Sequence, residues 1–172
     1  MGIGNFFGLM PQDARGASAL HGVELDRITS GIATALYPDA KIARMGYQEY
    51  AIPDGYFDVA VGNPPFGSEK LYDANRKDLS GFSIHNYFFA RSVDALRPGG
   101  VLIIEGYGPR QMRYRTGGPG VLENLYTLPM IIDAFSGWQI LASREVDQDL
   151  AEGTAHVGRS HLVSAVLKRP AS

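Results

Sequence analysis

Short apolar runs alternate with helix-like segments along most of this 172-residue chain, and this alternation restricts the folds open to it. The candidate strands are residues 21–25, 40–44, 56–62 and 101–107, and the candidate helices are residues 26–38, 83–100 and 127–135. The first of these helices has Ile28, Ile32 and Leu36 at a spacing of four, which is helical periodicity. Strand–helix alternation predicts an α/β fold with a mainly parallel sheet.

The last two candidate strands, residues 138–146 and 161–168, have no helix between them. A parallel return requires a long crossover, so we expect these two strands to be antiparallel and to be joined by a polar loop over residues 151–160. The chain length favours a single domain over residues 1–172.

The amino-acid composition further restricts the class of protein to which this chain can belong. Apolar residues make up 45% of the chain, charged residues 20%, and the formal net charge is −2, so no global basic field attracts nucleic acid. The chain has no cysteine, which excludes disulfides and thiolate metal sites. No apolar run approaches the roughly 20 residues of a bilayer span, and no basic leader precedes the glycine-rich start. We therefore expect a cytoplasmic protein without a membrane partner.

Two features near the N-terminus indicate a nucleotide-type cofactor. Gly2 and Gly4 form a G-x-G turn, where backbone approaches a ligand closely; the alternative is a flexible glycine-rich terminus. Glu24 follows a predicted strand 20 residues after Gly4, the spacing at which an acid accepts hydrogen bonds from ribose hydroxyls. Asp26 is a second candidate for the cofactor, although its position favours a helix N-cap.

The stretch Asn63-Pro64-Pro65-Phe66 directly follows the predicted strand 56–62. An amine on a heteroaromatic ring is a poor nucleophile, because its lone pair is delocalised. The Asn63 amide oxygen and the Pro64 carbonyl are suited to accept its two N–H groups; the diproline fixes the carbonyl, and Phe66 is suited to stack on the ring. The alternative is a strand-ending turn in which Phe66 packs into the core.

Together these motifs resemble class I methyltransferases that use S-adenosylmethionine, and N-P-P-F resembles the signature of their amino-methylating branch. Residues 1–100 are similar to the adenine methylase domain of plasmid- and phage-borne DNA methylase/helicase-like proteins. The resemblance implies a Rossmann-like three-layer sandwich. It also assigns the cofactor to Gly2, Gly4 and Glu24.

Related adenine methylases carry an acid after the third strand that contacts the adenine of the cofactor. By its spacing to Asn63, Tyr47 occupies that place here, with Glu49 two residues further on. The resemblance therefore implies a contact from Tyr47 or Glu49 to the cofactor.

The second half resembles another group. "RTGGPG", "LYTL" and "EGTAHVG" are similar to segments of tellurite-resistance-like small-molecule methyltransferases, which predicts a chimera with its seam near residues 96–104. The strand that normally precedes the G-x-G turn is missing, because only Met1 stands before Gly2. In the family's strand order, 3-2-1-4-5-7-6, the second and fourth strands would then have unpaired edges.

Other chemistry-bearing residues give weaker signals. Arg110, Arg113 and Arg115 could meet an acidic substrate, but a solvated loop is favoured. His156 and His161 lack partners for a metal site, so no metal is expected. Tyr107 would either line a substrate pocket or pack at its rim.

The leading hypothesis is methyl transfer from S-adenosylmethionine to an exocyclic amine, with adenine in DNA as the first candidate. RNA guanine, a protein glutamine amide, a small molecule, and a truncated domain without catalysis are the alternatives. With a net charge of −2 and no recognition domain, DNA binding by this chain alone should be weak.

Overall fold

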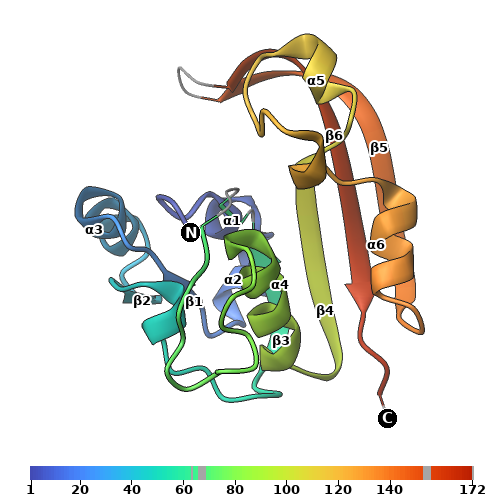
Figure 1. Ribbon diagram of the computed structural model, residues 1–172. Helices are drawn as coiled ribbons and strands as arrows, with labels where there is room; N and C mark the ends of the chain where they lie inside the picture. The colour runs from blue at the N-terminus through green and yellow to red at the C-terminus, as the bar shows by residue number, and fades with distance from the viewer. Residues whose placement is uncertain (63, 66–68, 153–155, 172) are drawn as a thin grey trace. The chain divides into compact units, whose positions relative to one another are not determined.

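The computed structural model describes residues 1–62, 64–65, 69–152 and 156–171. Its elements are α1 (Asn5–Leu9), α2 (Gln12–Gly16), β1 (His21–Val23), α3 (Arg27–Leu36), β2 (Lys41–Ala43), η1 (Tyr47–Glu49), β3 (Phe57–Gly62), α4 (Ile84–Ala95), β4 (Leu96–Tyr107), α5 (Gln111–Tyr114), η2 (Leu122–Asn124), α6 (Leu128–Ala134), β5 (Gln139–Glu152) and β6 (His156–Lys168). They form two compact units: an N-terminal unit, Met1–Ile52 with Leu71–Gly81, and a C-terminal unit, Pro53–Lys70 with Phe82–Ser172. Figure 1 shows the elements of each.

The N-terminal unit contains a two-stranded parallel sheet. β1 pairs with β2 in the register His21↔Lys41 to Val23↔Ala43, and α3 is the crossover between them. The side chain of Asp26 accepts a hydrogen bond from the Thr29 N–H and so caps the start of α3. The predicted strand–helix–strand order over residues 21–44 is confirmed.

The C-terminal unit contains a four-stranded sheet with the order β3-β4-β6-β5. β3 and β4 are parallel and are connected through α4, whereas β6 runs antiparallel to both β4 and β5 (Figure 1). The antiparallel pairing expected for the last two strands is therefore confirmed.

The main hydrophobic core lies in the C-terminal unit. Its fully buried members come from β4, α6 and β6: Leu96, Leu102, Ile104, Ile131, Val163, Ala165 and Leu167. The β4–β6 register places Leu102 opposite Leu167 and Ile104 opposite Ala165, so these side chains share one face of the sheet. Phe89 and Val93 of α4 and Phe135 just after α6 pack against that face.

The boundary between α4 and β4 differs from the sequence prediction. Helix α4 ends at Ala95 rather than continuing to Gly100, and β4 begins at Leu96. The register with β3 shifts between Phe57 and Val59, and this irregularity accommodates Pro98, which has no N–H for the ladder.

The predicted polar loop over residues 151–160 is also wrong. β5 runs to Glu152 and β6 starts at His156, so this segment is largely a continuation of the hairpin. Asp149 is opposite Arg159 in the register, and their side chains form an ion pair at 3.4 Å. Cross-strand pairs of opposite charge stabilise a ladder even where the sequence is polar.

Within residues 1–62, α1 and α2 precede β1, and β1 is the first described strand. In the described part of the chain, β1 pairs with β2 and β3 pairs with β4, in two separate sheets. Among the described helices, none has the length and apolar character needed to cross a bilayer.

Candidate functional site

The glycine turn opens the N-terminal unit. Gly2 and Gly4 both have positive φ, at 62° and 91°, and the Gly4 carbonyl accepts the first hydrogen bonds of α1, from Phe7 at 2.9 Å and Gly8 at 3.2 Å. A Cβ at Gly4 would lie 2.5 Å from the ring of Tyr37, whereas a Cβ at Gly2 would meet no atom within 4 Å. Gly4 is therefore required by the local packing, and the backbone at Gly2 is open to approach by a ligand.

Glu24 lies directly against this turn. Its Oε2 accepts hydrogen bonds from the Gly2 N–H at 2.7 Å and from the Met1 amino group at 3.0 Å, and its Oε1 accepts one from the Asp26 N–H at 3.0 Å. The Glu24 N–H extends the ladder by donating to the Ala43 carbonyl at 3.0 Å. The acid and the glycine turn, 20 residues apart in sequence, are thus neighbours in space.

The hydrogen bonds at Glu24 also determine its charge. Partial burial raises the pKa of the carboxyl group, but the donors from Asp26, Met1 and Gly2 together outweigh it, and the pKa falls below its ordinary value. Glu24 is therefore an ionised acceptor at neutral pH.

The acceptor capacity of Glu24 fits a ribose. A carboxylate offers about four lone-pair directions, and the donors from Met1, Gly2 and Asp26 occupy three of them. One direction remains at Oε1, and displacement of the Met1 amino group would release a second at Oε2. Two acceptor positions beside an open glycine turn suit the paired hydroxyls of an adenosine-type cofactor.

The other three predicted cofactor residues lie in the same unit with different roles. Asp26 is exposed, and its Oδ1 accepts the Thr29 N–H at 2.7 Å, which makes it the N-cap of α3. Hydrogen bonds from Thr29 lower the pKa of Asp26. Tyr47 and Glu49 form the short helix η1 after β2; Tyr47 is half-buried and Glu49 is exposed. A contact of either residue with the cofactor stays a prediction.

The predicted amine-binding motif follows β3 in the C-terminal unit. β3 ends at Gly62, directly before Asn63, so the prediction that the strand stops at the diproline is confirmed. Pro64 is buried and Pro65 is exposed. Asn63 and Phe66 lie outside the described residues, and their roles stay predictions.

Tyr107, at the end of β4, belongs to a small second core. It is 7% exposed and packs with Leu125 and Leu162. A Cβ at Gly118 would come 2.8 Å from its ring, so the loop backbone lies close against it. These contacts favour packing over a pocket-lining role.

Sequence reasoning missed a polar network at the end of the β5–β6 hairpin. Arg110 pairs through Nε with Asp147 at 3.1 Å and through Nη1 with Glu145 at 3.3 Å. A hydrogen bond from Arg110 lowers the pKa of Asp147 in spite of desolvation, which raises it. The pKa of Arg110 is raised, first by that hydrogen bond. Arg113 and Arg115 are exposed, as expected for a solvated loop.

His161 completes this network. Its Nδ1 accepts the Arg110 N–H at 3.0 Å, so its Nε2 carries the proton and donates to Glu145 at 3.1 Å. Both ring nitrogens are used within the protein, and the side chain is 1% exposed. No group of residues that could hold a metal ion occurs in the described part of the chain. The contacts of His161 depend on the register between strands, so no sequence motif predicts them.

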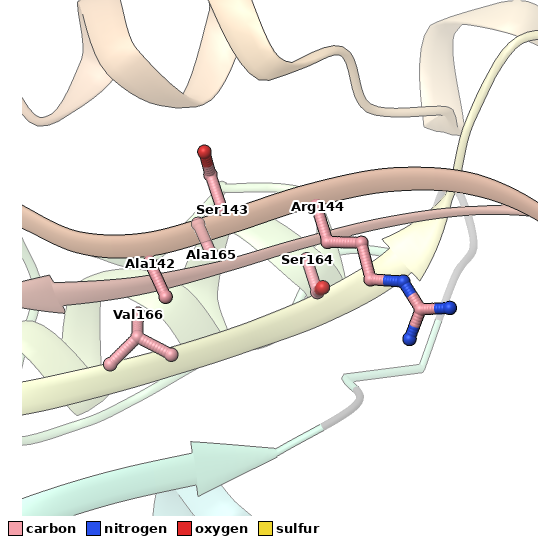
Figure 2. A pocket seen from close by; sticks show the side chains of 6 residues that line it. All are labelled: Ala142, Ser143, Arg144, Ser164, Ala165 and Val166. Atoms are coloured by element: carbon pink, nitrogen blue, oxygen red, sulfur yellow. The ribbon is translucent and has the colours of Figure 1, made fainter.

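A shallow hollow lies on the β5–β6 hairpin of the C-terminal unit (Figure 2). Its lining residues are Ala142, Ser143, Arg144, Ser164, Ala165 and Val166. Its volume is about 80 Å³, well below the roughly 300–1,000 Å³ of most ligand pockets. None of the predicted site residues lines it.

Solved structures share this fold. A methyltransferase dependent on S-adenosylmethionine from Mesorhizobium loti is 21% identical, with a TM-score of 0.55 over 98% of this chain and 87% of its own. A TehB-like methyltransferase from Corynebacterium glutamicum is 16% identical, with a TM-score of 0.56; the match covers 98% of this chain and 76% of that protein. The [4+2]-cyclase SpnF is 12% identical, with a TM-score of 0.53; the match covers 91% of this chain and 67% of the cyclase. No family model and no curated protein matches the sequence.

The fold is therefore the Rossmann-like fold of class I methyltransferases, with a mainly parallel arrangement completed by antiparallel strands. SpnF shows that this fold also occurs in a cyclase, so the activity has to be argued from the site.

Proposed function

We propose that the protein binds S-adenosylmethionine and transfers its methyl group to an exocyclic amine, with adenine in DNA as the first substrate to test. The observation that carries the proposal is the 2.7 Å hydrogen bond from the Gly2 N–H to Glu24. It joins an open glycine turn to an ionised acid in a fold common among methyltransferases.

In this proposal each half of the reaction has its own residues. Glu24 accepts the ribose hydroxyls, and the backbone at Gly2 and Gly4 lets the cofactor approach closely. S-adenosylmethionine supplies an electrophilic methyl group on its sulfonium. Asn63 and the Pro64 carbonyl would accept the two amine N–H groups and direct the nitrogen lone pair toward that methyl. Formation of the N–C bond would break the S–C bond and release S-adenosylhomocysteine, and the surplus amine proton would pass to solvent. Catalysis then comes mainly from positioning and polarisation.

The decisive test is Asn63→Ala. Losing one such hydrogen bond in the transition state should lower the single-turnover rate on adenine-containing DNA by about 10²–10³-fold. The affinity for S-adenosylmethionine, measured by calorimetry, should stay unchanged, because Asn63 acts on the substrate. A fully active Asn63→Ala variant would mean that N-P-P-F only ends a strand and has no role in the reaction.

Phe66 separates stacking from packing. Phe66→Ala should weaken substrate binding by about 1–3 kcal/mol if a base stacks there. Phe66→Tyr and Phe66→Trp should retain activity, because either ring can stack. A core-packing role would instead lower the stability of Phe66→Ala by about 3–5 kcal/mol. The melting temperature of each variant distinguishes these outcomes.

A small-molecule acceptor is the second candidate. It is favoured by the TehB-like methyltransferase from C. glutamicum, whose fold matches 98% of this chain and so includes both halves. The net charge of −2 also disfavours strong DNA binding. Parallel assays with DNA, RNA, a glutamine peptide and small amines would distinguish these acceptors. Cofactor binding without transfer to any of them would indicate a domain without this catalysis.

A further inference from the structure

Helix α3 presents its large apolar side chains to solvent. Ile28 is 72% exposed, Ile32 43% and Leu36 56%, and Leu25, just before the helix, is 73% exposed. The side chains that α3 buries are small: Ser30 is 4% exposed and Ala33 is 0% exposed. A surface helix of a monomer normally has the opposite arrangement, with its large apolar residues inside.

These exposed residues form one continuous stripe. Positions 28, 32 and 36 are successive i, i+4 neighbours, and Gly31 and Ala35 lie beside them on the same side of the helix. We call these five residues the α3 stripe. It carries no charge, and its small residues leave room between the branched ones. Exposed apolar stripes of this kind mark interaction surfaces.

We propose that the α3 stripe binds the α3 stripe of a second copy of this chain, with the two helices antiparallel about a two-fold axis near Ile32. In this arrangement Ile28 of one copy packs beside Leu36 of the other, and Gly31 and Ala35 allow the helices to approach closely. A patch that pairs with itself in this way forms a closed, isologous dimer. This inference does not depend on the proposed methyl transfer.

Charge at the two ends of the stripe favours the antiparallel orientation. Arg27 begins the helix and Asp39 follows its end; both are exposed, and neither has an ion-pair partner in the described part of the chain. Centring the pair on Ile32 brings Arg27 of one copy within about one helical turn of Asp39 of the other. Antiparallel helix dipoles add to this attraction. A parallel pair would instead align like charges.

The interface is small, so the dimer should be weak. A ten-residue helix is only about 15 Å long, which places the contact among the small, transient interfaces. We expect a dissociation constant on the order of 10 μM.

Sedimentation velocity over about 1–200 μM protein tests the dimer. The wild-type chain should shift from monomer to dimer, and Ile28→Glu with Ile32→Glu should weaken association at least tenfold. Leu122→Glu is the matched control, because Leu122 is 59% exposed and lies in the C-terminal unit. A chain that stays monomeric throughout, or a dimer that the double variant leaves intact, overturns the proposal.

Two further pairs of variants test the orientation and the contact face without altering buried residues. Arg27→Asp should weaken the dimer, and adding Asp39→Arg should restore it. Because the chain has no cysteine, Ile32→Cys should give a disulfide-linked dimer on mild oxidation, whereas the exposed Thr34→Cys should not. No rescue by the charge exchange would contradict the antiparallel orientation, and equal cross-linking at both positions would contradict the α3 stripe as the contact face.

Discussion

The two units of this molecule differ sharply in how well their sheets are completed. β1 and β2 have three residues each and form a two-stranded sheet, whereas β4, β5 and β6 have 12 to 14 residues and form a four-stranded sheet with β3. Two short strands are at best marginally stable in water, but three or more strands with an apolar face support themselves. We therefore expect the N-terminal unit to be the less stable of the two.

The burial of apolar residues follows the same division. The main core belongs to the C-terminal unit, with Leu96 and Val163 both fully buried. In the N-terminal unit the exposed residues include Leu9 at 81% and the α3 stripe. The predicted cofactor residues thus lie in the N-terminal unit, which has the smaller apolar core. Ligand-binding segments are commonly drawn from such low-stability regions, where binding and local folding are coupled.

The largest expected effect comes from adding a strand to the N-terminal unit. A chain with about eight apolar residues placed ahead of Met1 should gain ladder hydrogen bonds along the edge of β1 that does not pair with β2. At about 1 kcal/mol net for each bond, stability should rise by several kcal/mol. Because the strand would anchor the Gly2–Gly4 turn, the affinity for S-adenosylmethionine should rise as well.

Urea unfolding and calorimetry on the extended and original chains check this. An extension of the same length made of glycine and serine is the control, because it cannot form an apolar strand. If the apolar extension changes neither stability nor affinity, the two-stranded sheet is not what limits the stability of the N-terminal unit.

The second effect compares the two units directly. Leu167→Ala removes a side chain that is 1% exposed in the C-terminal core and should destabilise the protein by about 2–5 kcal/mol. Leu9→Ala, at 81% exposed in the N-terminal unit, should change stability by at most about 0.5 kcal/mol. Denaturant unfolding measures both. Comparable losses would mean that the N-terminal unit buries Leu9 in solution.

The sequence was sufficient for the order of the strands and of the three main helices because periodicity and stop signals are local. The helix at residues 26–38, the strand ending before Asn63 and the antiparallel end of the sheet all appear as predicted. The hairpin extension over residues 151–160 was not predictable, because it depends on cross-strand pairs such as Asp149 with Arg159. The bulge around Pro98 likewise depends on the neighbouring strand.

For the candidate site, sequence spacing was informative only for residues near the glycine turn. The spacing from Gly4 to Glu24 predicted a ribose contact, which stays a prediction, and the structure places Glu24 against the Gly2 N–H. The same spacing argument left the position of Asp26 ambiguous, and its hydrogen bond to Thr29 identifies a helix cap. The His161–Glu145 contact had no local signal, because strand register alone brings these residues together.

The third effect concerns the cofactor. Glu24→Ala should weaken the binding of S-adenosylmethionine by about 1.5–3 kcal/mol, the usual contribution of hydrogen bonds to a charged group. Glu24→Gln, which keeps the side-chain shape and one acceptor oxygen, should lose less affinity for S-adenosylmethionine than Glu24→Ala. Calorimetry measures the affinities, and circular dichroism confirms the fold. Unchanged affinity in a folded Glu24→Ala would remove the ribose assignment, and with it the link between the N-terminal unit and the cofactor.

The smallest effect concerns the cap of α3. Asp26→Asn keeps an acceptor for the Thr29 N–H, whereas Asp26→Ala removes it and should lower stability, with little change in cofactor affinity. The pKa of Asp26 is lowered in the folded protein, so its charged form adds stability above the unfolded pKa of about 3.9, and this stability is lost as pH falls through the folded pKa. The stability difference between wild type and Asp26→Asn should therefore be constant above about pH 5 and shrink as the solution is acidified below about pH 4. Urea unfolding at several pH values measures it. A difference that does not vary with pH would show that the charge of Asp26 does not contribute to holding α3, and would leave the hydrogen bond alone as the cap.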